Sequence, residues 1–121
     1  MTYDVHFDPE INCIFMHVSG RVTLEVIREL AIRVSGICAE KKCYRVLNDM
    51  RTATVKISIP DLYAVPKTMS ESGLPRRLMR ALVVPSDFDD SEFLENVTRN
   101  RGHNLMVFKD IEKAKEWLKL G

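Results

Sequence analysis

The sequence predicts an α/β fold in which a five-stranded mixed sheet is accompanied by four helices. Short apolar segments with strand character alternate with longer segments whose apolar residues follow helical spacing. Only the first two strand-like segments are joined by a turn alone, which predicts an antiparallel hairpin. Every later strand is separated from the next by a helix, which predicts parallel pairs linked by right-handed crossovers. The expected order is ββαβαβαβα, in a single domain over residues 1–121.

Two periodicities define the first half of the chain. Alternating residues around an Asp-Pro-Glu turn indicate the hairpin, and an i, i+3, i+4, i+7 apolar pattern from Thr23 indicates a helix. Lys41 and Lys42 end this helix, where the negative end of the helix dipole favours positive charge. The predicted elements are strands over 3–7 and 12–18, a helix from Thr23 to Lys42, a strand over 44–49 and a loop over 50–57.

The second half begins with a helix start at Ser58. This serine is followed three residues later by Asp61, with Pro60 in the first turn, which is a typical capping pattern. Pro66 removes one backbone hydrogen bond inside the helix and is expected to kink it. The remaining predicted elements are a strand over 78–84, a helix after Asp89-Asp90 that stops at Gly102, a strand over 105–108 and a helix from Asp110 to Leu118.

Composition limits the function classes. The 18 Lys and Arg residues nearly balance the 17 Asp and Glu residues, so no global field favours nucleic acid. No secretory signal pattern and no apolar run long enough to span a membrane occurs, and we therefore expect a cytoplasmic protein. Cys13, Cys38 and Cys43 match no zinc or redox spacing, which favours three reduced thiols.

Residues at the exit of the third strand and at the end of the chain resemble a known superfamily. The sequence is similar to SpoIIAA-like proteins, the fold of STAS domains, and more narrowly to uncharacterised bacterial STAS/SEC14-like proteins. The resemblance implies a non-enzymatic regulatory module that works by protein contact, expected to be a homodimer. The SEC14-like resemblance implies an alternative, a carrier of a small apolar or anionic ligand. The resembling residues are 46–51 (VLNDMR), 100–102 (NRG), 107–110 (VFKD), Ala114 and 116–118 (EWL).

Ser58 is the candidate phosphoacceptor that the resemblance implies. Phosphorylatable antagonists of this superfamily carry an Asp-Ser-Ser/Thr-Gly type motif at the start of the corresponding helix. Residues 56–60 here are KISIP, so only the serine itself matches that motif. A helix-capping role for the Ser58 hydroxyl needs nothing further and is the alternative that we favour.

Apolar residues around the predicted loop are candidate contacts for a partner or ligand. Val55, Ile57 and Ile59 would be unfavourable to leave in water together. They either fold back over the sheet, which is the interpretation that we favour, or join Tyr63 in a surface patch. Alternation across the loop also permits a short extra strand that pairs with a second copy. In the carrier alternative, the kinked helix holds a ligand against the sheet. The candidates are Val55, Ile57, Ile59, Leu62, Tyr63 and Met69.

Two basic groups are candidate anion contacts. Arg76, Arg77 and Arg80 lie near Lys67 in one group, and Arg99, Arg101 and His103 form the other. Guanidinium groups suit carboxylate or phosphate, although solvated charges at helix ends explain the same pattern and are the interpretation that we favour. The absence of interleaved aromatic residues argues against nucleic acid.

Catalytic and metal motifs were not found in the sequence. The histidines are widely spaced, and no zinc protease, serine hydrolase, P-loop or dinucleotide motif occurs. Acids at Asp87, Asp89, Asp90 and Glu92 precede a helix, where the helix dipole favours them without any metal. We therefore predict no catalytic residues, no metal and no cofactor.

Overall fold

The computed structural model describes residues 2–120, and it confirms the predicted order ββαβαβαβα. The ends of the predicted domain, Met1 and Gly121, lie outside the described residues. The elements are β1 (Thr2–Asp8), β2 (Cys13–Val22), α1 (Leu24–Lys41), β3 (Arg45–Val55), α2 (Ile59–Glu71), β4 (Met79–Val83), α3 (Ser91–Arg99), β5 (Leu105–Phe108) and α4 (Ile111–Trp117).

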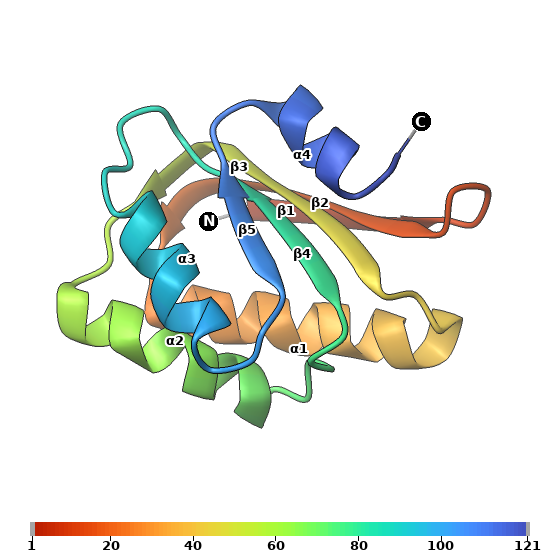
Figure 1. Cartoon of the computed structure of the whole chain (residues 1–121), viewed down its shortest axis with the longest axis horizontal. Helices are drawn as coiled ribbons and strands as arrows, with labels where there is room; N and C mark the ends of the chain where they lie inside the picture. The colour runs from red at the N-terminus through yellow and green to blue at the C-terminus, as the bar shows by residue number, and fades with distance from the viewer. Residues whose placement is uncertain (1, 121) are drawn as a thin grey trace.

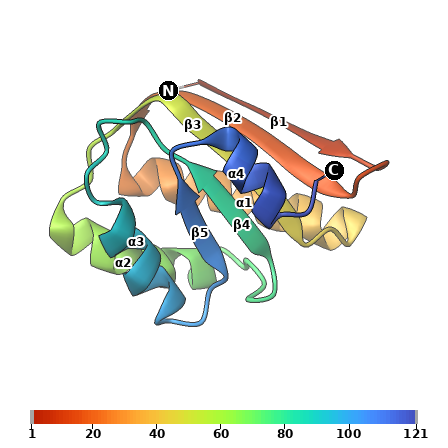
Figure 2. The ribbon, with the colours of Figure 1, turned by 45° about the horizontal axis from the view of Figure 1, so that its top comes forward.

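The five strands form one mixed sheet in the order β1-β2-β3-β4-β5. The β1 and β2 strands pair antiparallel, and the later neighbours pair in parallel, as predicted. Helices α1, α2 and α3 cover one face of the sheet, and α4 lies on the other face (Figure 1, Figure 2). Each pair of parallel neighbours is therefore linked by a helix that crosses over the sheet, as the alternation in the sequence predicts.

The core is divided by the sheet into two layers. The larger layer lies between the sheet and helices α1 to α3, and includes Ile14, Val34 and Leu62. The smaller layer lies under α4, where Ala114 and Leu118 pack against β3 and β4. Within residues 2–120, no helix combines the length and the apolar character that a membrane crossing requires.

The predicted loop over residues 50–57 is wrong for most of its length, because β3 continues to Val55. Residues 53–55 at the end of β3 pair with Gly20, Arg21 and Val22 of β2, after a register shift between His17 and Ser19. The short extra strand that the alternation permits is therefore an extension of β3, which pairs with β2 on one edge, while the pairing of β3 with β4 ends at Asp49. Gly20 adopts a φ of 89°, which explains how the strand accommodates the irregularity instead of ending there.

Candidate functional site

The α2 helix has one face in the core and one in solvent. Its inward residues Leu62, Val65 and Met69 are 0 to 2% exposed. Its outward residues are Ile59, Tyr63, Lys67 and Ser70, which follow one another at the spacing of a single helical stripe. We call these four residues the outward stripe of α2. The stripe is apolar toward the N-terminus of the helix and polar toward its C-terminus.

Ser58 caps α2, as the sequence predicts. Its Oγ accepts a hydrogen bond from the backbone N–H of Asp61 at 3.3 Å, and Pro60 occupies the first turn. The serine remains exposed at this helix N-terminus. The hydroxyl therefore stabilises the helix start while staying accessible to solvent.

The apolar part of the outward stripe is the most exposed apolar surface of α2. Tyr63 is 57% exposed and Ile59 is 45% exposed. The ring of Tyr63 meets the half-buried ring of Phe93 from α3 edge to face, with 5.0 Å between centroids. This contact fixes the position of the tyrosine while leaving most of its surface in water.

The polar part of the stripe borders an open cleft of about 350 Å³. Three cations line it: Lys67 from α2, Arg76 from the α2–β4 connection and Arg101 from the α3–β5 connection. None of the ion pairs within residues 2–120 involves these three side chains. We call this site the basic cleft. Tyr63 also lines it, so the apolar and basic surfaces are continuous.

The inner side of the basic cleft is a buried histidine. His103 is 4% exposed, and its Nε2 lies 3.0 Å from Oγ of Ser70, which lines the cleft. Burial, and then the nearby charges of Arg80 and Arg76, lower the pKa of His103 below its ordinary value. The imidazole is therefore neutral at pH 7, and the positive charge of the cleft comes from Lys67, Arg76 and Arg101.

The three arginines predicted as anion contacts, Arg76, Arg77 and Arg80, lie in different surroundings. Arg76 donates a hydrogen bond to the carbonyl of Arg101. The guanidinium carbon of Arg77 lies 3.7 Å from the ring centre of Tyr44. Arg80 points beneath α2, where burial lowers its pKa to about 10. Only Arg76 of these three lines the basic cleft.

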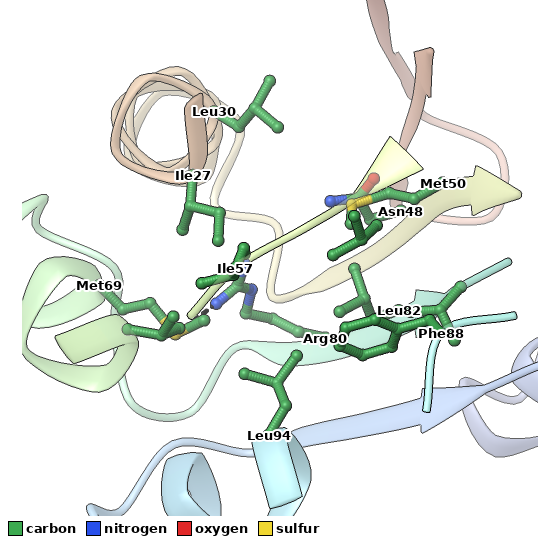
Figure 3. Close-up of a pocket in the computed structure, with 13 residues that line it drawn as sticks. Ile27, Leu30, Asn48, Met50, Ile57, Met69, Arg80, Leu82, Phe88 and Leu94 are labelled. Carbon is green, nitrogen blue, oxygen red and sulfur yellow. Dashed lines mark hydrogen bonds between the residues drawn. The ribbon is translucent and has the colours of Figure 1, made fainter. Parts of the chain in front are cut away.

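A small cavity lies between the sheet and the helices that cover it (Figure 3). It encloses about 30 Å³ and is lined by residues of α1, α2, α3, β3, β4 and their connections. Three predicted contact residues line this cavity: Val55, Ile57 and Met69. Leu62 does not line it and is buried in the core, so its predicted contact with a partner or ligand stays a prediction. Tyr63 faces outward instead.

Other reactive side chains have structural partners. His6 stacks on Phe15 at 5.3 Å, and His17 Nε2 lies 3.2 Å from Oγ1 of Thr52. No group of three or more metal-ligating side chains within residues 2–120 is placed to hold an ion. The buried thiols are poor nucleophiles, because burial raises the pKa of Cys13 to about 12 and that of Cys38 to about 11.

Comparisons with known proteins identify the fold. No protein-family model and no curated protein matches this sequence, whereas solved structures match its fold. An uncharacterised DUF3478-family protein from Shewanella loihica is 14% identical, with a TM-score of 0.59 over 96% of this chain and 93% of that one. The unphosphorylated anti-sigma factor antagonist SpoIIAA is 8% identical, with a TM-score of 0.55 over 99% and 100%. Phosphorylated SpoIIAA of Bacillus is 8% identical, with a TM-score of 0.53 over 96% of this chain and 99% of that one.

These matches place the chain in a structural class. The protein has a SpoIIAA-like fold, which confirms the resemblance drawn from the third strand and the C-terminal residues. SpoIIAA itself is a cell fate determinant of Bacillus, and its structure is known with and without phosphorylation. At this level of identity, the match establishes the architecture of the chain.

Proposed function

We propose that this protein is a non-catalytic interaction module that docks a partner protein along the outward stripe of α2. The observation that carries the proposal is the exposure of Tyr63, at 57%, next to Ile59 on the same stripe. Tyrosine is enriched among the residues that dominate binding energy at protein interfaces. The fold supports the proposal, because SpoIIAA, which shares it, is an anti-sigma factor antagonist.

The charge of the site defines the chemistry of the partner. Lys67, Arg76 and Arg101 lie on one side of Tyr63, in the basic cleft. A complementary surface carries an apolar side chain for Tyr63 and Ile59, and carboxylates for the three cations. The partner is therefore a protein with an acidic surface segment that contains at least one large apolar residue.

The same charge disfavours a second copy of this chain on the outward stripe. A two-fold interface places the same patch on both subunits, so the two basic clefts would approach one another. Like charges brought together across an interface are strongly unfavourable. The expected homodimer stays a prediction, and light scattering at high micromolar concentration tests it, since a monomer there contradicts it.

Ser58 supplies a means of regulating the proposed docking. Its side chain is exposed directly before Ile59, at the N-terminus of the docking helix. A phosphate here would be favoured by the positive end of the helix dipole. It would also place negative charge beside the surface proposed to receive an acidic partner. Phosphorylation at Ser58 is therefore expected to weaken docking.

A photo-crosslinking amino acid placed at position 63 tests the docking proposal. The matched control carries the same group at position 32 on α1, because Ile32 is 56% exposed and Tyr63 is 57% exposed. A protein captured from position 63, and not from position 32, is then purified and its affinity is measured by calorimetry. We expect Tyr63→Ser to weaken binding at least tenfold and Ile32→Ser to leave it unchanged.

The electrostatic half of the proposal has its own test with the same purified partner. Reversing charge with Lys67→Glu and Arg101→Glu should weaken binding and reduce its dependence on salt. Equal capture from positions 63 and 32 contradicts the docking proposal. An affinity that survives both Tyr63→Ser and the charge reversal contradicts it as well.

A further inference from the structure

The interior cavity contains a cation without an anionic partner. Arg80 extends from β4 into the cavity, and its Nη1 lies 2.7 Å from the sulfur of Met69 (Figure 3). A thioether is only a weak hydrogen-bond acceptor. None of the ion pairs within residues 2–120 includes Arg80. Arg80 is therefore a half-buried arginine whose guanidinium lies in the cavity without the carboxylate that normally accompanies such a group.

The titratable groups near Arg80 do not neutralise it. Cys38 of α1 contributes to its electrostatic environment, and burial raises the pKa of that thiol to about 11. His103, in the α3–β5 connection, is neutral at pH 7 because its pKa is lowered. With a pKa of about 10, Arg80 itself remains charged at neutral pH. The interior thus carries one uncompensated positive charge.

A second polar group in the same cavity is also unsatisfied. Asn48 of β3 is 8% exposed, and its Oδ1 has no hydrogen-bond partner. Buried polar atoms in folded proteins nearly always have one. Most other lining residues are apolar, including Ile57, Leu82 and Phe88. Arg80 and these apolar residues are together complementary to an anionic head group on an apolar body, whereas Asn48 Oδ1 is an acceptor that a carboxylate does not satisfy.

We propose that the cavity binds an amphiphilic monocarboxylate, whose carboxylate pairs with Arg80 and whose hydrocarbon chain lies against Ile57, Phe88 and Leu94. A guanidinium presents two parallel N–H donors to a carboxylate, which provides both energy and orientation. The ligand supplies the negative charge that the interior lacks, and its chain leaves water. This site is separate from the outward stripe, so it stands independently of the docking proposal.

The size of the cavity defines how a ligand reaches it. The closed form encloses about 30 Å³, enough for one or two water molecules. A chain of several carbons therefore requires side chains at the cavity to move. Ile57 lies in the β3–α2 connection and Phe88 in the β4–α3 connection, so both can rotate without breaking a strand pair. Ligand access is expected from this side, where the parallel strands end.

Octanoate is the probe that tests the proposal, measured by calorimetry on the full chain. We expect octanoate to bind at least tenfold more tightly than octan-1-ol, which lacks the charge. Each added methylene buried in the cavity is expected to tighten binding about fourfold, so that hexanoate binds roughly fifteenfold more weakly than octanoate. Octan-1-ol that binds as tightly as octanoate overturns the proposal.

The variant Arg80→Met distinguishes a ligand-binding role of Arg80 from a purely structural one. Methionine keeps much of the length and removes the uncompensated charge, so the ligand-free variant should melt at a higher temperature while losing at least tenfold in octanoate affinity. Arg77→Met is the matched control, because Arg77 lies outside the cavity on Tyr44, and its octanoate affinity should equal that of the wild type. An Arg80→Met protein that keeps its octanoate affinity overturns the proposal.

A third variant covers the case in which Arg80→Met does not fold. Arg80→Lys keeps the charge and loses the planar fork, so it should fold and bind octanoate more weakly than the wild type. Unchanged affinity in Arg80→Lys overturns the assigned guanidinium contact. Tyr63→Ser should leave octanoate binding unchanged, which distinguishes failure of this proposal from failure of the docking proposal.

Discussion

Leu62 and Tyr63 are neighbours in α2 that face opposite directions, and replacing each by alanine separates stability from docking. Leu62 is fully buried and packs in the larger core layer, whereas Tyr63 is 57% exposed. Removing the buried leucine side chain beyond Cβ loses about 2.4 kcal/mol of transfer free energy. The remaining cavity adds a further penalty, which gives about 3 to 4 kcal/mol in total.

The expected change in melting temperature follows from the size of the chain. Unfolding entropy of about 2.1 cal/mol/K per residue gives about 0.25 kcal/mol/K for a protein of this length. A loss of about 3 kcal/mol therefore lowers the melting temperature of Leu62→Ala by about 12 °C. Tyr63→Ala loses mainly its contact with Phe93, so we expect a change of about 1 kcal/mol or less.

Urea unfolding followed by far-UV circular dichroism measures both variants. The slope of free energy against urea should stay constant, so that the midpoint reports stability alone. A Leu62→Ala protein within about 1 kcal/mol of the wild type would refute the placement of Leu62 in the core. A Tyr63→Ala protein as unstable as Leu62→Ala would show that the tyrosine is a structural residue, and would remove the basis of the docking proposal.

Three further predictions concern the helix cap, a loop glycine and a buried histidine. Ser58→Ala should lose about 1 kcal/mol of unfolding free energy. Ser58→Asp should keep the cap and weaken the binding of an acidic partner protein. An unchanged affinity for that partner leaves Ser58 as a cap only. Gly102→Ala should lose about 1 to 2 kcal/mol, because Gly102 has a φ of 89°, a left-handed conformation that an alanine adopts only with strain; wild-type stability in urea would contradict this. The pKa of His103 is lowered in the folded state, so the unfolded chain binds its proton first as pH falls. Its contribution to stability is therefore complete above about pH 6.5 and declines as pH falls below it, and His103→Gln should flatten that part of the curve measured by urea unfolding between pH 7.5 and 5.

The alternation in the sequence was sufficient to predict the fold, apart from the lengths of β2 and β3. Every predicted helix and strand is present in the predicted order. The sequence predicts that β2 stops before Ser19-Gly20 and that β3 stops at its polar residues Asn48 and Asp49. In the structure β2 continues past an irregularity, and its extension pairs with the second half of β3. Local propensity cannot reveal a strand pair that depends on a bulge.

The candidate site was only partly predictable, because proximity in sequence differs from proximity in space. Tyr63 and Ile59 are exposed, whereas Val55 and Ile57 are partly buried at the cavity, so each of the two alternatives weighed for these residues applies to part of them. The basic cleft, however, combines Lys67, Arg76 and Arg101 from three segments, and sequence spacing assigned them to two groups. Tertiary packing alone brings these side chains together.

The sequence carries a signal for the interior cation. Arg80 lies in the predicted strand over 78–84, where side chains alternate between the two faces. It shares a face with Leu82 and Val84, and both are buried on the helix-covered side of the sheet. An arginine among core positions of a strand indicates a buried charge. Grouping it with Arg76 and Arg77 by sequence distance concealed that pattern.

The two proposals meet in α2, whose outward face carries Tyr63 and whose inward face carries Met69 beside Arg80. A ligand that enters the cavity presses on the inward face of the helix that docks the partner. If this displaces α2, octanoate changes the affinity for the partner, and linkage requires the partner to change the affinity for octanoate by the same factor. Equal factors in the two titrations would show coupling through α2. A factor of one in both would show that the helix is held by its contacts with α1 and α3 while each face binds alone.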